Sequence, residues 1–104
     1  MKTYKVLWSF EAKIRLMDTY KYISSHLQNS VAARNLYNKL LYETSKLKYF
    51  PARHPDLSYY GKINKGYRRL RVDKFIIIYK VDFDTSKVFI LDIFHSNQNY
   101  LNLI

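Results

Sequence analysis

The run Phe75–Val81, Phe-Ile-Ile-Ile-Tyr-Lys-Val, constrains the fold of this chain more than any other segment. A dense series of β-branched and aromatic side chains favours a strand that is covered on at least one face. We therefore expect a central β-strand here. Alternating segments lie on either side of it, at Tyr67–Val72 and Val88–Phe94, and the residues between them, Asp73-Lys74 and Asp82–Ser86, predict turns. The second half of the chain is thus predicted to form three strands of a mainly antiparallel sheet.

The residues before this sheet predict one further strand and two helices. Thr3–Trp8 alternates apolar and polar side chains, and Ser9 is a candidate N-cap for a helix with apolar residues at helical spacing, namely Ala12, Leu16, Tyr20 and Ile23. The segment 24–29 interrupts that spacing and predicts a turn. Ser30 is then a candidate N-cap for a second helix, which must end before Pro51. The order β-α-α-β-β-β predicts an α+β fold, a helical hairpin packed on a small sheet, as a single domain over residues 1–104.

The sequence has a formal net charge of +10, from 18 Lys and Arg against 8 Asp and Glu. Nine of those basic residues and only two Asp lie within Lys46–Lys74, a net +7 in 29 residues that include a predicted loop, Pro51–Lys65. Aromatic residues are interleaved with them: Tyr49, Phe50, Tyr59, Tyr60 and Tyr67. Basic groups neutralise phosphates and aromatic rings stack on unpaired bases, so this segment favours contact with nucleic acid or the ribosome. The alternative is a solvated basic surface with half-buried tyrosines.

Composition and spacing exclude several classes of protein. The absence of cysteine excludes a disulfide framework and a thiolate zinc site, and the three histidines lack the spacing of metal ligands. Two glycines are too few for phosphate-binding or dinucleotide-binding loops. We therefore expect neither a metal nor a cofactor. The longest apolar runs have four to five residues, and the N-terminus lacks the apolar core of a signal peptide. These features predict a cytoplasmic protein that does not span a membrane.

The most informative basic segment is Gly66–Val72. On a strand, Tyr67, Arg69 and Arg71 share one face, which suits contact with a phosphate backbone. The alternative is an edge strand that its charges protect from aggregation. Arg68 shares the other face with apolar neighbours, so we expect it either to pair with an acid such as Asp92 or to be held towards a site. Lys62, Lys65 and Lys74 extend the basic surface, and we expect them to contact the target.

His95 ends the last predicted strand, close to Tyr100. A histidine beside a basic face can act as general acid or base on a phosphodiester, and a tyrosine can donate a hydrogen bond or stack on a base. The alternative for His95 is a structural residue at a strand edge.

Several motifs follow one another along almost the whole chain: Tyr4-Lys5-Val6, Ser9-Phe10-Glu11-Ala12, Tyr20-Lys21-Tyr22-Ile23, Phe50-Pro51, Gly66-Tyr67-Arg68-Arg69-Leu70, Lys74–Asp82 and Phe94-His95-Ser96-Asn97-Gln98-Asn99-Tyr100. In this order and spacing the sequence resembles the RelE/ParE superfamily of bacterial toxins from type II toxin–antitoxin pairs. The resemblance implies a small basic toxin that an acidic antitoxin neutralises by wrapping its surface. It also implies two alternative targets. RelE-like members enter the ribosomal A site and cleave mRNA, whereas ParE-like members inhibit DNA gyrase.

The resemblance also implies roles for particular residues. Arg68 and Arg71 fall in the strand that supplies basic groups, and His95 and Tyr100 fall in the C-terminal segment that supplies a catalytic or contact residue. The chain departs from the pattern at Ile76, where many members carry an Arg that is thought to stabilise the phosphate. Ribosome-dependent mRNA cleavage is the function we expect, with His95 as proton carrier and with Arg68 and Arg71 as catalytic residues that neutralise the phosphate. The alternatives are a gyrase inhibitor without nuclease activity and a non-toxic nucleic-acid-binding module.

Overall fold

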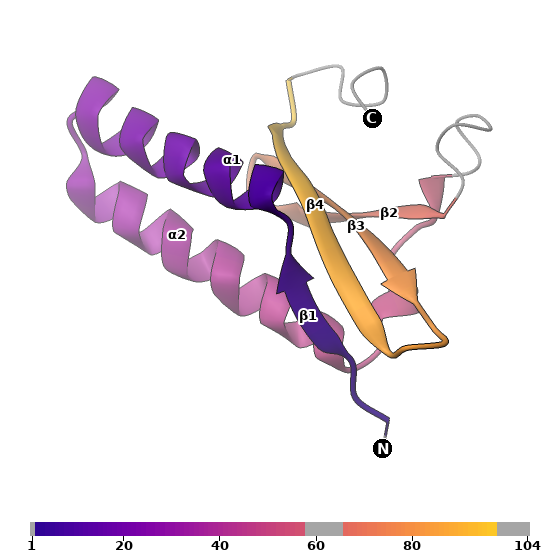
Figure 1. The fold of residues 1–104 in the computed structure, drawn as a ribbon. Coiled ribbons are helices and arrows are strands. Elements are labelled where there is room, and N and C mark those ends of the chain that lie inside the picture. Colours follow the sequence, from indigo (N-terminus) through magenta and orange to yellow (C-terminus); the bar gives the residue numbers. More distant parts are fainter. Residues whose placement is uncertain (1, 58–65, 98–104) are drawn as a thin grey trace.

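The computed structural model describes residues 2–57 and 66–97, which form two helices and a four-stranded sheet (Figure 1). The regular elements are, in chain order, β1 (Lys5–Trp8), α1 (Phe10–Lys21), α2 (Ser30–Ser45), β2 (Tyr67–Val72), β3 (Phe75–Asp82) and β4 (Lys87–His95). The order β-α-α-β-β-β is therefore confirmed.

The strand order in the sheet is β1-β4-β3-β2. β1 runs parallel to β4, from the pair Lys5 and Lys87 to the pair Trp8 and Ile90, and the other two pairings are antiparallel. β3 thus lies between two strands, as the run of isoleucines predicts, and β2 lies at an edge. The α+β fold and the mainly antiparallel sheet are confirmed.

The helical hairpin covers one face of this sheet, which we call the helix-side face (Figure 1). Leu16, Leu40 and other small or aliphatic side chains of the helices pack there against Ile77, Tyr79 and Ile90. Each of these five side chains is at least 94% buried. Burying one leucine or isoleucine side chain stabilises a fold by roughly 1.5–3 kcal/mol, so this cluster is the main source of stability.

A second, smaller cluster lies on the opposite face, which we call the outer face. It contains Leu57, Ile76, Ile78 and Phe94, with Tyr67 packed against it. Leu57 is fully buried although it belongs to the segment predicted as a loop. The helices cover only the helix-side face, and the side chain of Leu57 covers apolar residues on the outer face of the central strands.

A β-bulge in β4 decides which face each of its last residues joins. Ile78 of β3 pairs with Asp92 and Tyr79 pairs with Ile90, so Leu91 is an extra residue. Ile90 lies on the helix side, and the inserted residue puts Ile93 on that side too. Strict alternation would instead put Ile93 on the outer face.

The hairpin turn between β2 and β3 has the two predicted residues, Asp73 and Lys74. Asp73 has a φ of 54°, a left-handed conformation that Asp adopts more readily than most residues. The Nζ of Lys39 lies 2.6 Å from Oδ1 of Asp73 and joins the turn to α2. The hydrogen bond and the charge of Asp73 raise the pKa of Lys39.

One prediction about the helix ends is wrong, and another is confirmed only in part. The N-cap of α2 is Asn29, whose side chain accepts a hydrogen bond from the N–H of Ala32, and Ser30 is the first helical residue. The segment 24–29, predicted as an inter-helix turn, is non-helical only over residues 27–29, because a π-helical stretch, Tyr22–His26, continues α1. The prediction for Ser9 is confirmed: its hydroxyl accepts a hydrogen bond from the N–H of Ala12.

The segment after α2 is more ordered than the predicted loop. It contains two short 3-10 helices, Lys46–Lys48 and Pro51–Arg53. Beyond them, Asp56 forms an isolated bridge with Arg68 along the edge of β2. Of the extended piece that we predicted at Leu57–Tyr60, all but the first residue lies outside the described ranges.

Candidate functional site

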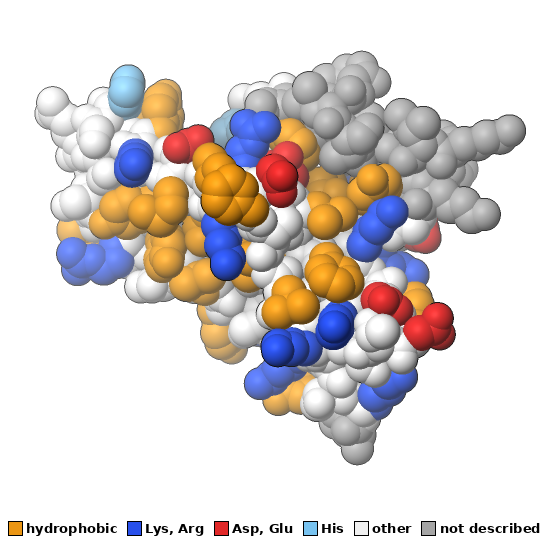
Figure 2. Space-filling view, in the orientation of Figure 1, with side chains coloured by type: hydrophobic (Ala, Val, Ile, Leu, Met, Phe, Trp, Pro, Cys, Tyr) orange, Lys and Arg blue, Asp and Glu red, His pale blue; other side chains and the backbone are white. Residues whose placement is uncertain are grey.

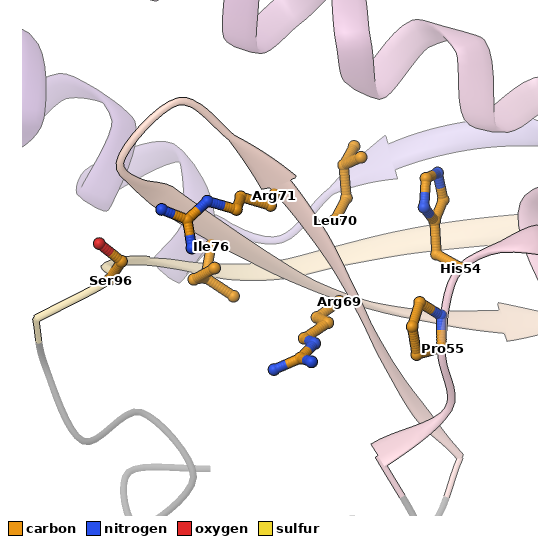
Figure 3. A pocket seen from close by; sticks show the side chains of 7 residues that line it. All are labelled: His54, Pro55, Arg69, Leu70, Arg71, Ile76 and Ser96. Carbon is orange, nitrogen blue, oxygen red and sulfur yellow. The ribbon is translucent and has the colours of Figure 1, made fainter.

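A groove of about 430 Å³ runs along the edge strand β2, and we call it the arginine groove. It is lined by His54, Pro55, Arg69, Leu70, Arg71, Ile76 and Ser96 (Figure 3). Figure 3 shows Arg71 beside Ile76, in agreement with their pairing across β2 and β3, and His54 and Pro55 on the neighbouring segment. Two guanidinium groups make this groove suited to an anionic or acidic partner.

The alternation of β2 orients the basic residues as predicted. Leu70 and Val72 are buried in the core on the helix side, so Arg69 and Arg71 lie on the outer face with Tyr67. The Nε of Arg71 donates a 3.0 Å hydrogen bond to the carbonyl oxygen of Asp73, which leaves this exposed side chain attached to the hairpin turn.

Tyr67 is half-buried at the far end of the same face. It packs against the small outer cluster, and the Nζ of Lys80, its partner across β2 and β3, lies 4.2 Å from its ring centroid. This is a cation–π contact, and the ammonium group of Lys80 adds a further positive charge to the outer face.

Of the two alternatives predicted for Arg68, the pairing with Asp92 is wrong. Its Nη1 donates hydrogen bonds of 3.1 Å and 2.8 Å to the carbonyl oxygens of Ala52 and His54. Asp92 instead binds Arg15 of α1, with Nε and Oδ1 3.1 Å apart. Arg68 therefore holds the 52–54 segment against the sheet and lies on the face opposite Arg69 and Arg71.

His54 and Tyr79 lie where this segment meets the helix-side core. The hydroxyl of Tyr79 donates a 2.5 Å hydrogen bond to the carbonyl oxygen of Pro51, and the ring of His54 packs edge-on against Tyr79. Burial lowers the pKa of His54, and the charges of Arg53 and Arg68 lower it further. Burial raises the pKa of Tyr79. At neutral pH the imidazole is therefore neutral and the phenol is protonated.

His95 is not directed towards the arginine groove. It pairs with Phe75 across β3 and β4, the two rings meet edge-on at 5.4 Å, and Phe75 packs in the helix-side core. A second groove of about 710 Å³, between α1 and the sheet, contains both His95 and Lys74. The Nδ1 of His95 accepts a 3.1 Å hydrogen bond from the N–H of Asn97. The structure therefore separates His95 and Lys74 from Arg69 and Arg71.

Three predicted contact residues, Lys62, Lys65 and Tyr100, lie outside the described residues. The groove adds two polar residues that we did not predict, His54 and Ser96. Ser96 directly follows His95 in the C-terminal motif, which was a usable signal, whereas nothing in the sequence ties His54 to β2. Within residues 2–57 and 66–97, no three His, Asp or Glu side chains are grouped so that they would hold a metal ion.

Comparison with known protein families identifies the chain. The model of the ParE toxin of type II toxin–antitoxin systems, parDE, matches residues 6–100. The chain belongs to this family. A search of curated proteins gave no match. No helix in the described part of this toxin is long and apolar enough to cross a membrane.

Solved structures support the same fold. The chain is similar to a protein of the chromosomal ParDE toxin–antitoxin system from P. aeruginosa, with a TM-score of 0.73 and 15% identity, over 91% of this chain and 98% of that one. It is also similar to a chain of the RelBE2 toxin–antitoxin complex from Mycobacterium tuberculosis, with a TM-score of 0.62 and 19% identity, over 91% and 93%. A chain of the RelE–RelB complex from Pyrococcus horikoshii OT3 has a TM-score of 0.62 and 18% identity, over 92% and 98%.

Proposed function

We propose that this type II toxin arrests growth by binding a protein target through the arginine groove, without cleaving RNA. The target that membership of the ParE family favours is DNA gyrase. The observation that carries the proposal is the position of His95. The residue that the sequence offered as proton carrier lies on the helix-side face, whereas Arg69 and Arg71 lie on the outer face. A general acid or base must reach the same phosphodiester as the cations that stabilise it.

Ile76 supports the same conclusion. Its side chain is 4% exposed and pairs with Phe94 in the outer cluster, next to Arg71 in the register of β2 and β3. An aliphatic side chain there stabilises the sheet and cannot neutralise a phosphate. The role that we assign to Arg69 and Arg71 is to form ion pairs and hydrogen bonds with acidic groups of a partner.

Cleavage of mRNA is the second candidate function, and one observation favours it. The arginine groove contains His54, which is neutral at neutral pH because of its lowered pKa, together with two arginines. A neutral imidazole can accept the proton of a ribose 2′-hydroxyl. Assays of gyrase activity and of mRNA integrity distinguish the two functions.

The test combines induced expression with assays on the purified toxin. We expect plasmid supercoiling by DNA gyrase to be inhibited, DNA breaks to accumulate in cells, and mRNA to stay intact. Arg71→Met should weaken gyrase inhibition about tenfold or more, whereas Lys5→Met, at the opposite edge of the sheet, should leave it unchanged. Growth arrest with cleaved mRNA and unaffected gyrase would overturn the proposal in favour of ribonuclease activity.

His95→Asn sharpens this test. The Oδ1 of Asn can replace Nδ1 of His95 as acceptor for the N–H of Asn97, so the variant removes the imidazole chemistry with little structural change. We expect it to retain growth arrest. A loss of activity of about a hundredfold, with normal stability, would restore His95 as a catalytic residue.

We further propose that the protein that neutralises this toxin is an acidic antitoxin. The net charge of +10 favours it, and α1 exposes Phe10, Ile14 and Met17 at spacings of four and three residues along one stripe. Figure 2 shows hydrophobic side chains over the helical hairpin with Lys and Arg among them. An amphipathic acidic segment complements such a surface. Ile14→Lys should keep growth arrest and lose neutralisation by the product of an adjacent acidic reading frame. Full neutralisation of that variant would exclude this stripe as the contact.

A further inference from the structure

We propose that this toxin has a second binding surface, for single-stranded nucleic acid, at the end of the molecule where β1 begins. The surface is a pocket of about 510 Å³ that includes Lys2, Tyr4, Phe50, Arg53 and Phe83, and we call it the aromatic pocket. It shares no lining residue with the arginine groove. The proposal is independent of the function proposed above.

Three separate segments bring the aromatic rings together. Figure 1 shows the start of the chain, the segment after α2 and the β3–β4 connection at the same end of the molecule. The N–H of Tyr4 donates a 2.8 Å hydrogen bond to the carbonyl oxygen of Lys48, and the next N–H, of Lys5, donates one of 2.9 Å to Ser86. Tyr4 is thereby fixed between the other two segments.

The other two rings are exposed on short, hydrogen-bonded turns. Phe83 is 50% exposed, and its ring packs edge-on against that of Tyr4, with the ring centroids 6.3 Å apart. It lies in a loop where Oδ1 of Asp82 accepts hydrogen bonds from the N–H groups of Asp84 and Thr85. Phe50 is 65% exposed, and its carbonyl oxygen accepts a hydrogen bond from the N–H of Arg53. The backbone thus presents both rings to solvent, although exposed phenylalanine is unfavourable in water.

The charges of the pocket identify its ligand. The pocket has two positively charged side chains, Lys2 and Arg53, and both are exposed. No Asp or Glu is among the lining residues that the structure describes. The Nζ of Lys2 lies 5.4 Å from the ring centroid of Tyr4. Aromatic rings that accept stacked bases, next to cations that follow the phosphates, are the physical basis of single-strand binding. An apolar peptide would make no use of these two cations.

The test measures binding of a fluorescent ten-nucleotide oligouridylate and an oligothymidylate by anisotropy, with the full-length toxin at several salt concentrations. Phe50→Leu and Phe83→Leu remove the stacking surface and keep an apolar side chain. We expect each to weaken binding about tenfold. Tyr22→Leu, which removes a similarly exposed ring from the far end of the helical hairpin, is the matched control and should change affinity less than twofold.

The charge test uses pairs of variants with the same net charge. Lys2→Gln with Arg53→Gln should lower the slope of log affinity against log salt by about 1.4, because each phosphate contact in a single strand contributes about 0.7. Lys21→Gln with Arg34→Gln, on the helices, should lower it less. Heparin serves as a polyanion without bases, and its binding should not respond to Phe50→Leu or Phe83→Leu.

Two results would overturn the proposal. One is that Phe50→Leu and Phe83→Leu bind the oligonucleotides as Tyr22→Leu does, which would leave only the general attraction of a basic protein for polyanions. The other is that a polyglutamate peptide loses affinity in both phenylalanine variants while the oligonucleotides do not, which would make the pocket a protein-binding surface. Thermal unfolding followed by circular dichroism confirms that each variant is folded.

Discussion

The hydroxyl of Ser9 donates a 3.1 Å hydrogen bond to the carbonyl oxygen of Leu91, the extra residue of the β4 bulge. The hydroxyl oxygen of Ser9 also accepts a 3.0 Å hydrogen bond from the N–H of Ala12 and so caps α1. One side chain therefore joins the start of the helical hairpin to the bulge. The bulge shifts the alternation of side chains in the last residues of β4, so that His95 lies on the helix-side face. The contact of Ser9 with the bulge therefore helps to hold His95 there.

Replacing Ser9 with alanine removes both hydrogen bonds. We expect Ser9→Ala to lower the free energy of unfolding by about 1–2 kcal/mol, measured by urea denaturation, since the loss of a serine cap alone costs about 1 kcal/mol. Ser45→Ala is the matched control, because its hydroxyl bonds only to Tyr42 of its own helix and is exposed. That variant should stay within about 0.5 kcal/mol of the parent toxin. Equal stability of the two variants would show that the Ser9 contacts are not stabilising.

Tyr79 makes a second contact between distant segments. Its side chain is fully buried and its hydroxyl donates to the buried Pro51, so Tyr79→Phe leaves a carbonyl group without its hydrogen bond inside the protein. We expect a loss of about 1–3 kcal/mol in the free energy of unfolding. Tyr42→Phe, at a ring that is 60% exposed, should have almost no effect. If both variants unfold at the same urea concentration, the Tyr79 hydroxyl contributes nothing to stability.

The two arginines to which the sequence assigned one catalytic role should behave differently when each is replaced with methionine. Arg68→Met should lower the free energy of unfolding by about 1–3 kcal/mol, because Arg68 holds two backbone carbonyl groups. Arg71→Met should change it by less than about 0.5 kcal/mol, since that side chain is exposed. Urea denaturation of both variants provides the comparison. A stable Arg68→Met toxin that no longer arrests growth would instead make Arg68 a target contact.

The fold could be predicted from the sequence because its strongest signals are local. The isoleucine run of β3, the alternation of β2 and the proline after α2 each fix one element or one boundary. The predicted cap of α2 was off by one residue, because Asn29 and Ser30 are both good capping residues. Periodicity does not distinguish a turn from a π-helical continuation, which is why residues 24–26 were assigned to the turn.

The candidate site was only partly predictable, because it depends on contacts between distant residues. Arg69 and Arg71 follow from alternation within one strand. The direction of His95 depends on the bulge at Leu91, which no local signal in β4 marks. The partners of Arg68 are backbone carbonyl groups, and their positions depend on how the 51–54 segment folds over the sheet. A sequence pattern can show that an arginine on the apolar face of a strand needs a partner, but it does not show which one.

The lowered pKa of His54 predicts a specific pH dependence of stability. Well above pH 6.5 the imidazole is neutral in both the folded and the unfolded chain, so the full stability is present. As the pH falls below 6.5, the unfolded chain takes up the proton first, because burial and the charges of Arg53 and Arg68 oppose protonation in the fold. The free energy of unfolding therefore decreases until the pH has passed below the folded-state pKa. We expect His54→Gln to lose less stability between pH 7.5 and pH 5 than the parent toxin, as measured by urea denaturation at each pH. His26→Gln, at an exposed histidine, is the control, and an equal pH response of the two variants would contradict the role of His54.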